Sequence, residues 1–172
     1  MMTELEQFRA AKDQFMKLDG DSPMTHEQKR NFTGLSYFPE NPSLSLEVVV
    51  EEFPQKERIE MQTSTGDIQS YQRFGRFKFA LEGEEVQLTI YADRGGYFLP
   101  FVDSLAGKET YPAGRYLEPE PLGNGRFWVD FNYAYNPYCA YNDLWSCPLT
   151  PAENRLKAPV RAGEKLFPGH EA

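Results

Sequence analysis

Histidine is nearly absent from this sequence, with only His26 and His170 among 172 residues. Catalytic sites that pair a nucleophile with a base usually place a histidine beside the nucleophile, so this scarcity argues against most familiar arrangements. Cysteine is just as scarce, and Cys139 and Cys147 alone supply too few soft ligands for a zinc site in one chain. We therefore expect no bound metal and no cofactor; a shared metal would require a second copy of the chain.

Basic residues are in the minority, because 18 Lys and Arg face 26 Asp and Glu and give a formal net charge of -8. Nucleic-acid phosphates and anionic membrane surfaces attract clusters of basic side chains, so we expect neither as a partner. The sequence also has no apolar run of transmembrane length, and its charged N-terminal residues do not resemble a signal peptide. We expect a cytoplasmic protein whose two cysteines are free thiols rather than a disulfide.

The length and patterning indicate a single domain, 1–172, with N-terminal helices at about 3–31, a β core at about 44–165 and a loosely held tail at 166–172. Apolar residues near one face predict an amphipathic helix from Thr3 to about Leu18. These residues are Leu5, Phe8, Ala11, Phe15 and Leu18. Thr25 and Gln28 have the spacing of a capping box, which predicts a short second helix through about Asn31.

From Leu44 to Val50, and again around Ile59 and Met61, apolar and polar residues alternate with the two-residue period of a β-strand. Gly75 predicts a β-bulge in a longer strand. Later strands are separated by turn sequences, at Gly66-Asp67, Glu82-Gly83, Arg94-Gly95-Gly96 and Asn124-Gly125. Strands joined by tight turns pair antiparallel. The sequence therefore predicts a mainly β (α+β) fold: an antiparallel, strongly curved meander sheet or barrel with the N-terminal helices packed against it.

The stretch from Gly123 to Lys165 combines aromatic rings, asparagines, both cysteines and several prolines with little regular periodicity. It opens with a predicted strand, Arg126 to Phe131, which is rich in aromatic residues. Pro137 lacks a backbone donor and restricts the residue before it, so the strand has to end by that point. Segments of this kind close a core, line a site, or do both.

Two polar clusters are candidates for chemistry. Asp130 and Asn132 share one face of a strand, and they either converge on a ligand at a barrel mouth or form a buried hydrogen-bond network. Arg115 could hold a carboxylate or phosphate, or pair with Asp130 or Glu153 inside the fold. Glu164 is expected at the end of an edge strand, with acid catalysis as the alternative.

Several motifs carry a resemblance to a known family. They are F-N-x-A-Y-N-P-x-C-A-Y at 131–141, C-P-x-x-P-x-E-N-x-L at 147–156 and A-G-E at 162–164, with Phe32–Leu35, Glu109–Tyr111 and Gly114–Leu117 upstream. On these residues the chain resembles the family catalogued as domain of unknown function 1684, over nearly its whole length. Leu105, Pro112 and Thr150 depart from the family pattern of threonine, glycine and proline, so a family role for that threonine hydroxyl could not be filled here. The resemblance implies no particular activity.

The two thiols have three further interpretations. They are buried small apolar residues, a reversible disulfide, or a thiolate nucleophile whose pKa is lowered by Arg115 or Arg155. Their separation in sequence permits all three, because the loop between Cys139 and Cys147 is short enough to close.

Our first hypothesis is a protein that binds a small molecule, with enzymatic activity left open. The candidate ligand-binding residues are Tyr111, Arg115, Asp130, Asn132, Tyr135, Asn136, Cys139 and Tyr141. In this hypothesis Arg115 holds an anionic group, and the tyrosines form apolar walls. The second hypothesis is an interaction or structural module, in which the same cluster is buried scaffold and a surface such as a homodimer edge carries the function.

Overall fold

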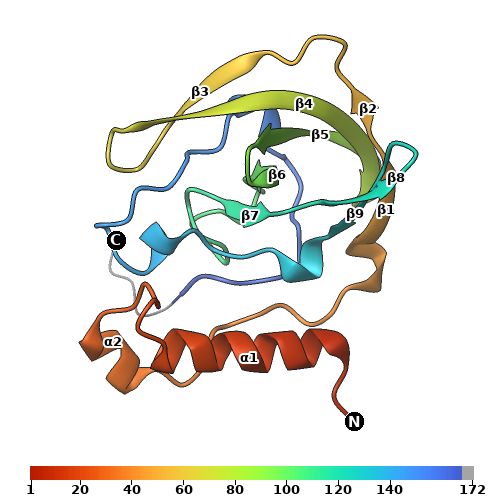
Figure 1. The fold of residues 1–172 in the computed structure, drawn as a ribbon. Coiled ribbons are helices and arrows are strands. Elements are labelled where there is room, and N and C mark those ends of the chain that lie inside the picture. The colour runs from red at the N-terminus through yellow and green to blue at the C-terminus, as the bar shows by residue number, and fades with distance from the viewer. Residues whose placement is uncertain (168–172) are drawn as a thin grey trace.

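Within residues 1–167, the part of the chain that this computed structural model describes, nine strands form two antiparallel sheets (Figure 1). The helices are α1 (Glu4–Leu18) and α2 (His26–Asn31). The strands are β1 (Ser45–Val49), β2 (Glu51–Glu52), β3 (Arg58–Gln62), β4 (Ile68–Leu81), β5 (Glu84–Asp93), β6 (Gly96–Phe101), β7 (Arg115–Leu117), β8 (Glu120–Gly123) and β9 (Arg126–Asp130). The mainly β, antiparallel class predicted from the sequence is confirmed.

The larger sheet has the strand order β2-β4-β5-β6-β7, and β3 pairs with β4 as well. Both β2 and β3 pair with the long strand β4, whose pairing with β5 shifts register between Arg73 and Gly75. This confirms the bulge predicted at Gly75. A Cβ there would lie 2.8 Å from the carbonyl oxygen of Glu51, so only glycine lets β2 approach β4 this closely.

The smaller sheet has the order β1-β9-β8. β8 and β9 form a hairpin through Asn124 and Gly125, whose φ angles of 56° and 75° confirm the turn predicted there. β1 continues into β2 of the larger sheet through Val50. No strand pairing among the described residues joins the two sheets into a closed barrel. Of the two predicted alternatives, the curved sheet is therefore correct.

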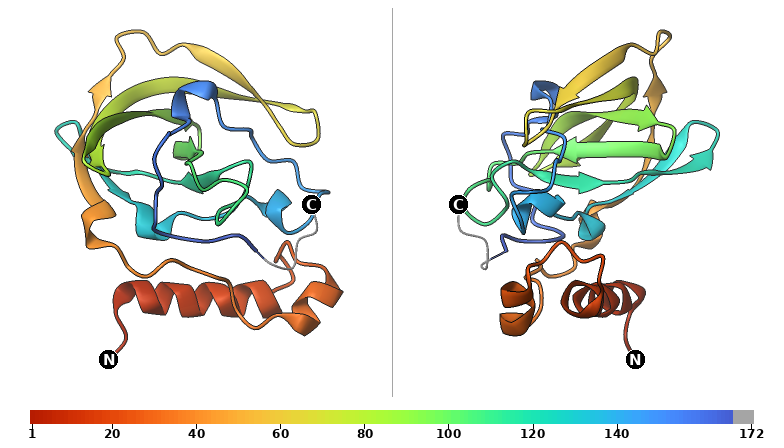
Figure 2. Two further views of the ribbon diagram at one scale, coloured as in Figure 1. Left: turned by 180° about the vertical axis from the view of Figure 1, so that it is seen from behind. Right: turned by 60° about the vertical axis from the view of Figure 1, so that its left-hand side comes forward.

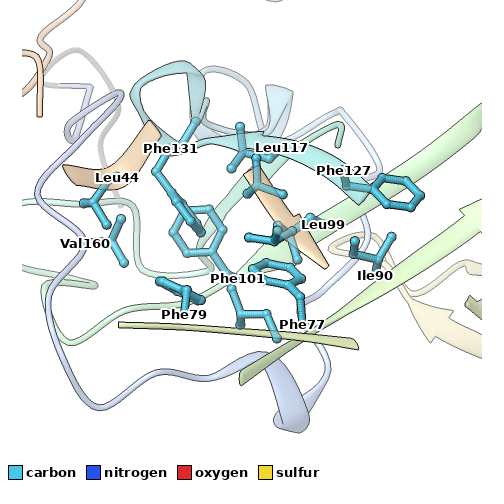
Figure 3. Packing of buried hydrophobic residues seen from close by; sticks show 14 of the residues in the cluster. Leu44, Phe77, Phe79, Ile90, Leu99, Phe101, Leu117, Phe127, Phe131 and Val160 are labelled. Atoms are coloured by element: carbon cyan, nitrogen blue, oxygen red, sulfur yellow. The ribbon is translucent and has the colours of Figure 1, made fainter. Parts of the chain in front are cut away.

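The main core lies between the two sheets (Figure 3). Phe131, which follows β9, is fully buried, and its ring stacks on Phe79 at 5.3 Å and meets Phe101 edge-on at 5.2 Å. Val160 and Ala162 complete the same cluster from the irregular chain beyond the last strand. Up to residue 167, the segment after β9 therefore closes the core although it adds no strand longer than an isolated bridge and no helix beyond short 3₁₀ turns, at Phe131–Tyr133, Tyr138–Ala140 and Ala152–Asn154.

Helix α1 lies across one end of the sheets. The C-terminal part of the chain runs between this helix and the sheets (Figures 1 and 2). The apolar stripe predicted for this helix is only partly buried, since Leu5 is covered but Phe8 and Leu18 are 43% and 68% exposed. Met16 is fully buried instead. The docked face is rotated away from the apolar stripe because α1 also docks through polar side chains, described below.

The tail prediction is wrong for its first two residues. The Leu166 amide donates to the Glu109 carbonyl at 2.8 Å, and Phe167 is buried against the Tyr141 ring at 4.9 Å. Residues 168–172 lie outside the described residues. Neither helix in the described part of the chain is long and apolar enough to cross a membrane.

Candidate functional site

Arg115, at the start of β7, is buried, and its guanidinium binds other groups of the protein. Its guanidinium donates to the carbonyl oxygens of Val160 at 2.9 Å and Glu164 at 3.1 Å, and also to that of Ala162. It pairs with Asp103 at 3.4 Å rather than with Asp130 or Glu153. Burial lowers the pKa of Arg115 to about 10, so the side chain stays charged at neutral pH. Arg115 thus ties the irregular C-terminal chain to the larger sheet.

Asp130 and Asn132 lie together, as predicted, but in a turn rather than along a strand. The Asn132 amide and its side-chain Nδ2 both donate to Asp130 Oδ1 at 2.9 Å. Asn132 also exchanges hydrogen bonds with the backbone of Asn41, at 2.8 and 2.9 Å. Both residues border a shallow cleft of about 610 Å³ with Glu4 and Glu40. The asparagine fixes the chain before β1 to the end of β9.

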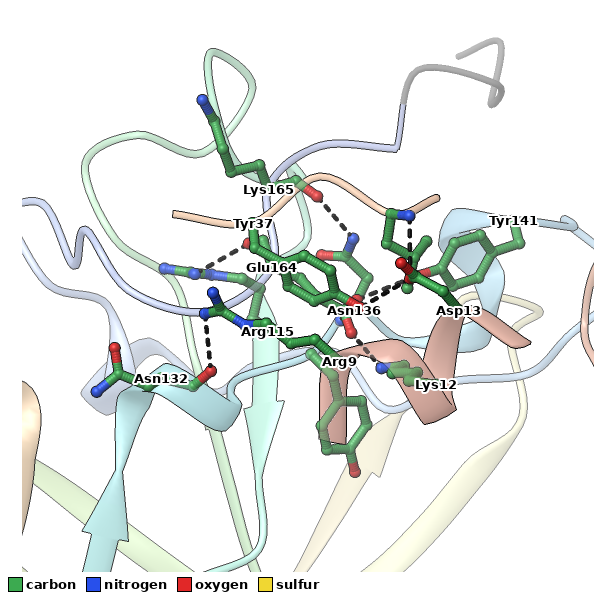
Figure 4. A network of polar contacts seen from close by, with 12 residues as sticks. Arg9, Lys12, Asp13, Tyr37, Arg115, Asn132, Asn136, Tyr141, Glu164 and Lys165 are labelled. Atoms are coloured by element: carbon green, nitrogen blue, oxygen red, sulfur yellow. Dashed lines mark hydrogen bonds and ion pairs between the residues drawn. The ribbon is translucent and has the colours of Figure 1, made fainter. Parts of the chain in front are cut away.

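Glu164 is the centre of a buried polar network (Figure 4). Its carboxylate accepts the Tyr141 hydroxyl at 3.1 Å and the Asn136 amide at 3.0 Å, and forms an ion pair with Lys12 of α1. Asn136 Nδ2 donates to the Lys165 carbonyl at 3.0 Å. Burial, and then the Glu164 charge, raise the pKa of Tyr141 well above its ordinary value. The network brings the candidates Asn136 and Tyr141 together around a glutamate.

The same network holds α1 in place (Figure 4). Asp13 Oδ1 accepts the Tyr37 hydroxyl at 3.0 Å and the Leu35 amide at 3.1 Å. Arg9 donates to the Asn132 carbonyl at 3.4 Å and its guanidinium lies 4.5 Å from the centre of the Tyr37 ring. These contacts explain why α1 docks by a face richer in charge than its apolar stripe.

The two cysteines meet in a separate apolar cluster. Both are buried and free, and the Cys139 amide donates to Cys147 Sγ at 3.3 Å. The Tyr111 hydroxyl donates to Cys139 Sγ at 3.5 Å, and the Tyr116 ring packs beside both thiols. A hydrogen bond from the Cys147 thiol lowers the pKa of Cys139 to about 6 and raises that of Cys147.

A cleft of about 660 Å³, here called the helix cleft, lies between α1 and the segment after β9. Its walls are mostly aromatic and aliphatic, with Cys147 among them: Phe8, Ala11, Lys12, Phe15, Met16, Tyr116, Glu118, Tyr135, Pro137, Tyr138, Trp145, Ser146, Cys147 and Pro148. A second cleft of about 810 Å³ over β6 and β8 shares Tyr116, Glu118, Tyr135 and Pro148 with it. Of the candidates predicted from the sequence, only Tyr135 lines the helix cleft.

The predicted residues therefore fall into four places. Asn136 and Tyr141 surround Glu164, with Arg115 bound to the carbonyl of the same residue. The others form the Tyr111 and Cys139 contact, the Asp130 and Asn132 turn, and the Tyr135 wall of the cleft. Sequence reasoning placed Glu164 at a strand end and missed its central position. The available signal was the A-G-E motif at 162–164, in which an acidic residue directly follows an alanine and a glycine.

Asn154 was also missed, although its side chain is fully buried. Its Nδ2 donates to the carbonyls of Thr89 and Pro100 at 2.8 Å, and its Oδ1 accepts the Thr89 amide at 2.8 Å.

Asn154→Ala should lower the free energy of unfolding by about 2 kcal/mol, because it leaves these buried backbone groups without their hydrogen-bond partner. Urea unfolding would measure it, with Asn142→Ala as the control, and a loss equal to the control's would contradict this assignment.

Among the described residues, no group of three or more His, Cys, Asp or Glu side chains is arranged to hold a metal ion. The molecule is thus a curved antiparallel β protein in which an irregular segment, fastened by buried polar contacts, covers the core and borders a cleft beneath a helix. The chain belongs to the family described as "Protein of unknown function (DUF1684)", whose model matches residues 30–165. Helix α1 precedes the matched region.

A solved structure supports the fold independently. The solution NMR structure of an uncharacterised protein from Haloarcula marismortui is similar to this chain with a TM-score of 0.74 and 36% sequence identity. The similarity covers 97% of this chain and 95% of that one, so it includes α1. None of the curated proteins matches the chain.

Proposed function

We propose that the protein binds a small, apolar, aromatic molecule in the helix cleft. The observation that carries this proposal is that large apolar side chains stay exposed around a concave space: Phe8 is 43%, Tyr138 36% and Trp145 41% exposed. Folding alone would favour their burial, whereas a ligand pocket requires such walls before the ligand arrives. The volume of about 660 Å³ is within the range of small-molecule sites.

The charges in the cleft favour a neutral ligand. Glu118 already accepts the Tyr135 hydroxyl at 2.6 Å, and Lys12 is paired with Glu164. Lys12 Nζ also lies 5.0 Å from the centre of the Tyr135 ring. Since both charged groups have partners within the protein, an ionic ligand would have to displace one of them. A neutral aromatic ligand could stack against Tyr138 and Trp145, whose rings meet edge-on at 5.0 Å, without displacing either charged group from its partner.

Filling the cleft should abolish this binding. Ala11 lines the cleft on the exposed side of α1, so the ring of Ala11→Trp would occupy it without disturbing the core. We expect the Kd of the neutral dye N-phenyl-1-naphthylamine, read by its fluorescence, to rise at least about tenfold, or about 1.4 kcal/mol. Ala10→Trp, at an exposed position of the same helix that does not line the cleft, carries the same propensity cost and should bind as wild type. Equal binding by the two variants, or none by wild type, would refute the proposal.

The two tryptophans provide a second readout. Trp145 lies in the cleft wall and Trp128 does not. In a Trp128→Phe background the remaining tryptophan therefore reports on the cleft alone. A screen of neutral aromatic compounds, read by Trp145 fluorescence and by thermal shift, would narrow the ligand class, because binding to the native state raises the melting temperature.

A second candidate function, an interaction module, is favoured by exposed apolar residues outside the cleft. Leu144 and Leu18 are 87% and 68% exposed, and Leu149 is 40% exposed. The burial of Arg115 and Asn132 also suits this hypothesis, in which the predicted cluster is scaffold. Sedimentation velocity tests it: association that rises with concentration and disappears in Leu144→Glu would support a homodimer over a ligand-binding monomer.

We also propose that the protein is cytoplasmic, and its buried free thiols support this location.

A further inference from the structure

The cysteine pair is held from two directions by the backbone. Cys139 lies in the 3₁₀ turn Tyr138–Ala140, and its amide donates to Cys147 Sγ at 3.3 Å. Cys147 is fixed to the chain after β3, since its amide donates to Ser64 Oγ at 3.2 Å and its carbonyl accepts the Ser64 amide at 3.0 Å. The two sulfur atoms are therefore neighbours because both segments are anchored, and the seven residues between them form a closed loop.

The surroundings of the pair differ from those of ordinary core cysteines. Burial in an apolar site alone would raise the pKa of a thiol. Here hydrogen bonds from the Cys147 thiol and from the Tyr111 hydroxyl outweigh burial, and the pKa of Cys139 is lowered to about 6. The Tyr116 hydroxyl also interacts with both thiols, and Asp143 acts on Tyr111. The donors favour a thiolate at neutral pH.

One thiol of the pair lines a cleft. Cys147 lines the helix cleft beside Tyr116 and Pro148, although it is only 7% exposed. A small molecule in the cleft would therefore contact Cys147; Cys139, which is 4% exposed, packs in the same cluster as Cys147 and does not itself line the cleft. No use of the two thiols follows from the binding function proposed above.

We propose that Cys139 and Cys147 form a redox-active dithiol that reduces small organic hydroperoxides entering through the helix cleft, and that closes into a disulfide as it does so. This inference rests on the proposed function only in using the helix cleft as its entrance. The reductant is the dithiol itself, and the co-reactant is the hydroperoxide.

The reaction balances in two steps. The Cys139 thiolate attacks the terminal oxygen of the hydroperoxide and breaks the O–O bond; a sulfenic acid forms and the alkoxide leaves as an alcohol with the proton of the Cys147 thiol. The Cys147 thiolate then attacks the Cys139 sulfur, the S–S bond forms, and the S–O bond breaks. The hydroxide combines with the proton that Cys139 first lost and leaves as water. Both sulfurs are oxidised, and a peroxide becomes an alcohol and water.

The test mixes reduced protein with cumene hydroperoxide, and quenches it by alkylation under denaturing conditions. Intact mass should show a product lighter by two hydrogen atoms that carries no alkyl groups, formed at least about tenfold faster than glutathione is oxidised. In Cys147→Ser the reaction should stop at a sulfenic acid that dimedone traps on Cys139, and Cys139→Ser should lose the fast reaction. Oxidation of wild type no faster than glutathione, or without a disulfide, would overturn the proposal, and this arm needs no variant.

A pH titration of the thiolate absorbance gives an independent reading. The wild-type protein should gain one thiolate with a midpoint below the ordinary thiol range, and Cys139→Ser should lack that step. A first midpoint at or above the ordinary thiol range would contradict the proposal.

The blocked cleft separates this inference from the proposed function. Ala11→Trp should slow the hydroperoxide reaction, whereas Ala10→Trp should not. If the dye fails to bind wild type but the disulfide forms fast, the binding function fails and the dithiol stands. If the dye binds but the thiols react no faster than glutathione, the binding function stands and the dithiol is refuted.

Discussion

Replacing Arg115 by methionine is expected to lower the free energy of unfolding by about 3–5 kcal/mol, because it leaves a buried charge without its partner. The Asp103 side chain is as deeply buried as that of Arg115, and without Arg115 its donors among the described residues are the neutral groups of Thr110 and Val160. The carbonyls of residues 160, 162 and 164 would lose their donors at the same time. The irregular C-terminal segment should then detach from the sheet, and urea unfolding of the variant would measure the loss.

Arg126→Met is the matched control for this experiment. Arg126 pairs with Glu47 at 3.2 Å, but both side chains are about half exposed, so the loss should be about 0–1 kcal/mol. Arg115→Lys keeps the charge but not the planar fork of donors, so its loss of unfolding free energy should lie between those of the two methionine variants. A loss below about 1 kcal/mol for Arg115→Met would mean that the side chain is not structural, and would restore it as a ligand-binding candidate.

The parts of the fold that were predictable from the sequence are those written in local patterns. Asn124-Gly125 predicted a hairpin because both residues adopt positive φ, and the observed angles of 56° and 75° agree. Gly75 predicted a bulge, and the register of β4 shifts there. The alternation at Leu46 and Val48 likewise predicted a half-buried strand. Each of these signals depends on neighbours a few residues away.

Contacts between distant segments could not be predicted in this way. Arg115 was expected to bind a ligand or to pair with Asp130 or Glu153, yet Glu153 pairs with Arg73 on the larger sheet and Arg115 pairs with Asp103. Which carboxylate an arginine meets depends on how the segment after β9 crosses the sheets, and that path follows no period. The rotation of α1 has the same origin, because it depends on polar contacts with distant residues, among them Asn132 and Glu164.

Scaffold and cleft are therefore neighbours rather than the same set of residues. The motif residues Asn136, Tyr141 and Glu164 form hydrogen bonds mainly with one another and with backbone, which fixes the path of the segment. That path in turn places Tyr135 and Cys147 in the wall of the helix cleft. Of the network around Glu164, only Lys12 also lines the cleft, so the polar, irregular motif contributes mostly scaffold residues beside the proposed site.

Gly163→Ala is the second change expected to have a large effect, a loss of about 2–5 kcal/mol of unfolding free energy. Gly163 has a φ of 79°, and a Cβ there would lie 2.7 Å from the Phe131 carbonyl oxygen and 2.8 Å from both the Cβ and the carbonyl oxygen of Ala134. Positive φ costs alanine about 1–2 kcal/mol, and forcing backbone apart in a packed core adds about 1–3 kcal/mol. The carbonyl of Gly163 also accepts the Phe38 amide at 2.9 Å, so any shift disturbs that contact too.

Gly83→Ala isolates the two causes, because Gly83 has the same φ of 79° but no atom within 4 Å of the added Cβ. It should cost only the conformational part, about 1–2 kcal/mol. The difference between the two variants in urea unfolding therefore measures how closely residues 162–164 press against the end of the core. A Gly163→Ala loss equal to that of Gly83→Ala would show that residues 162–164 can shift to make room for the methyl group. Because Lys12 of α1 pairs with Glu164, α1 would have to shift with this segment.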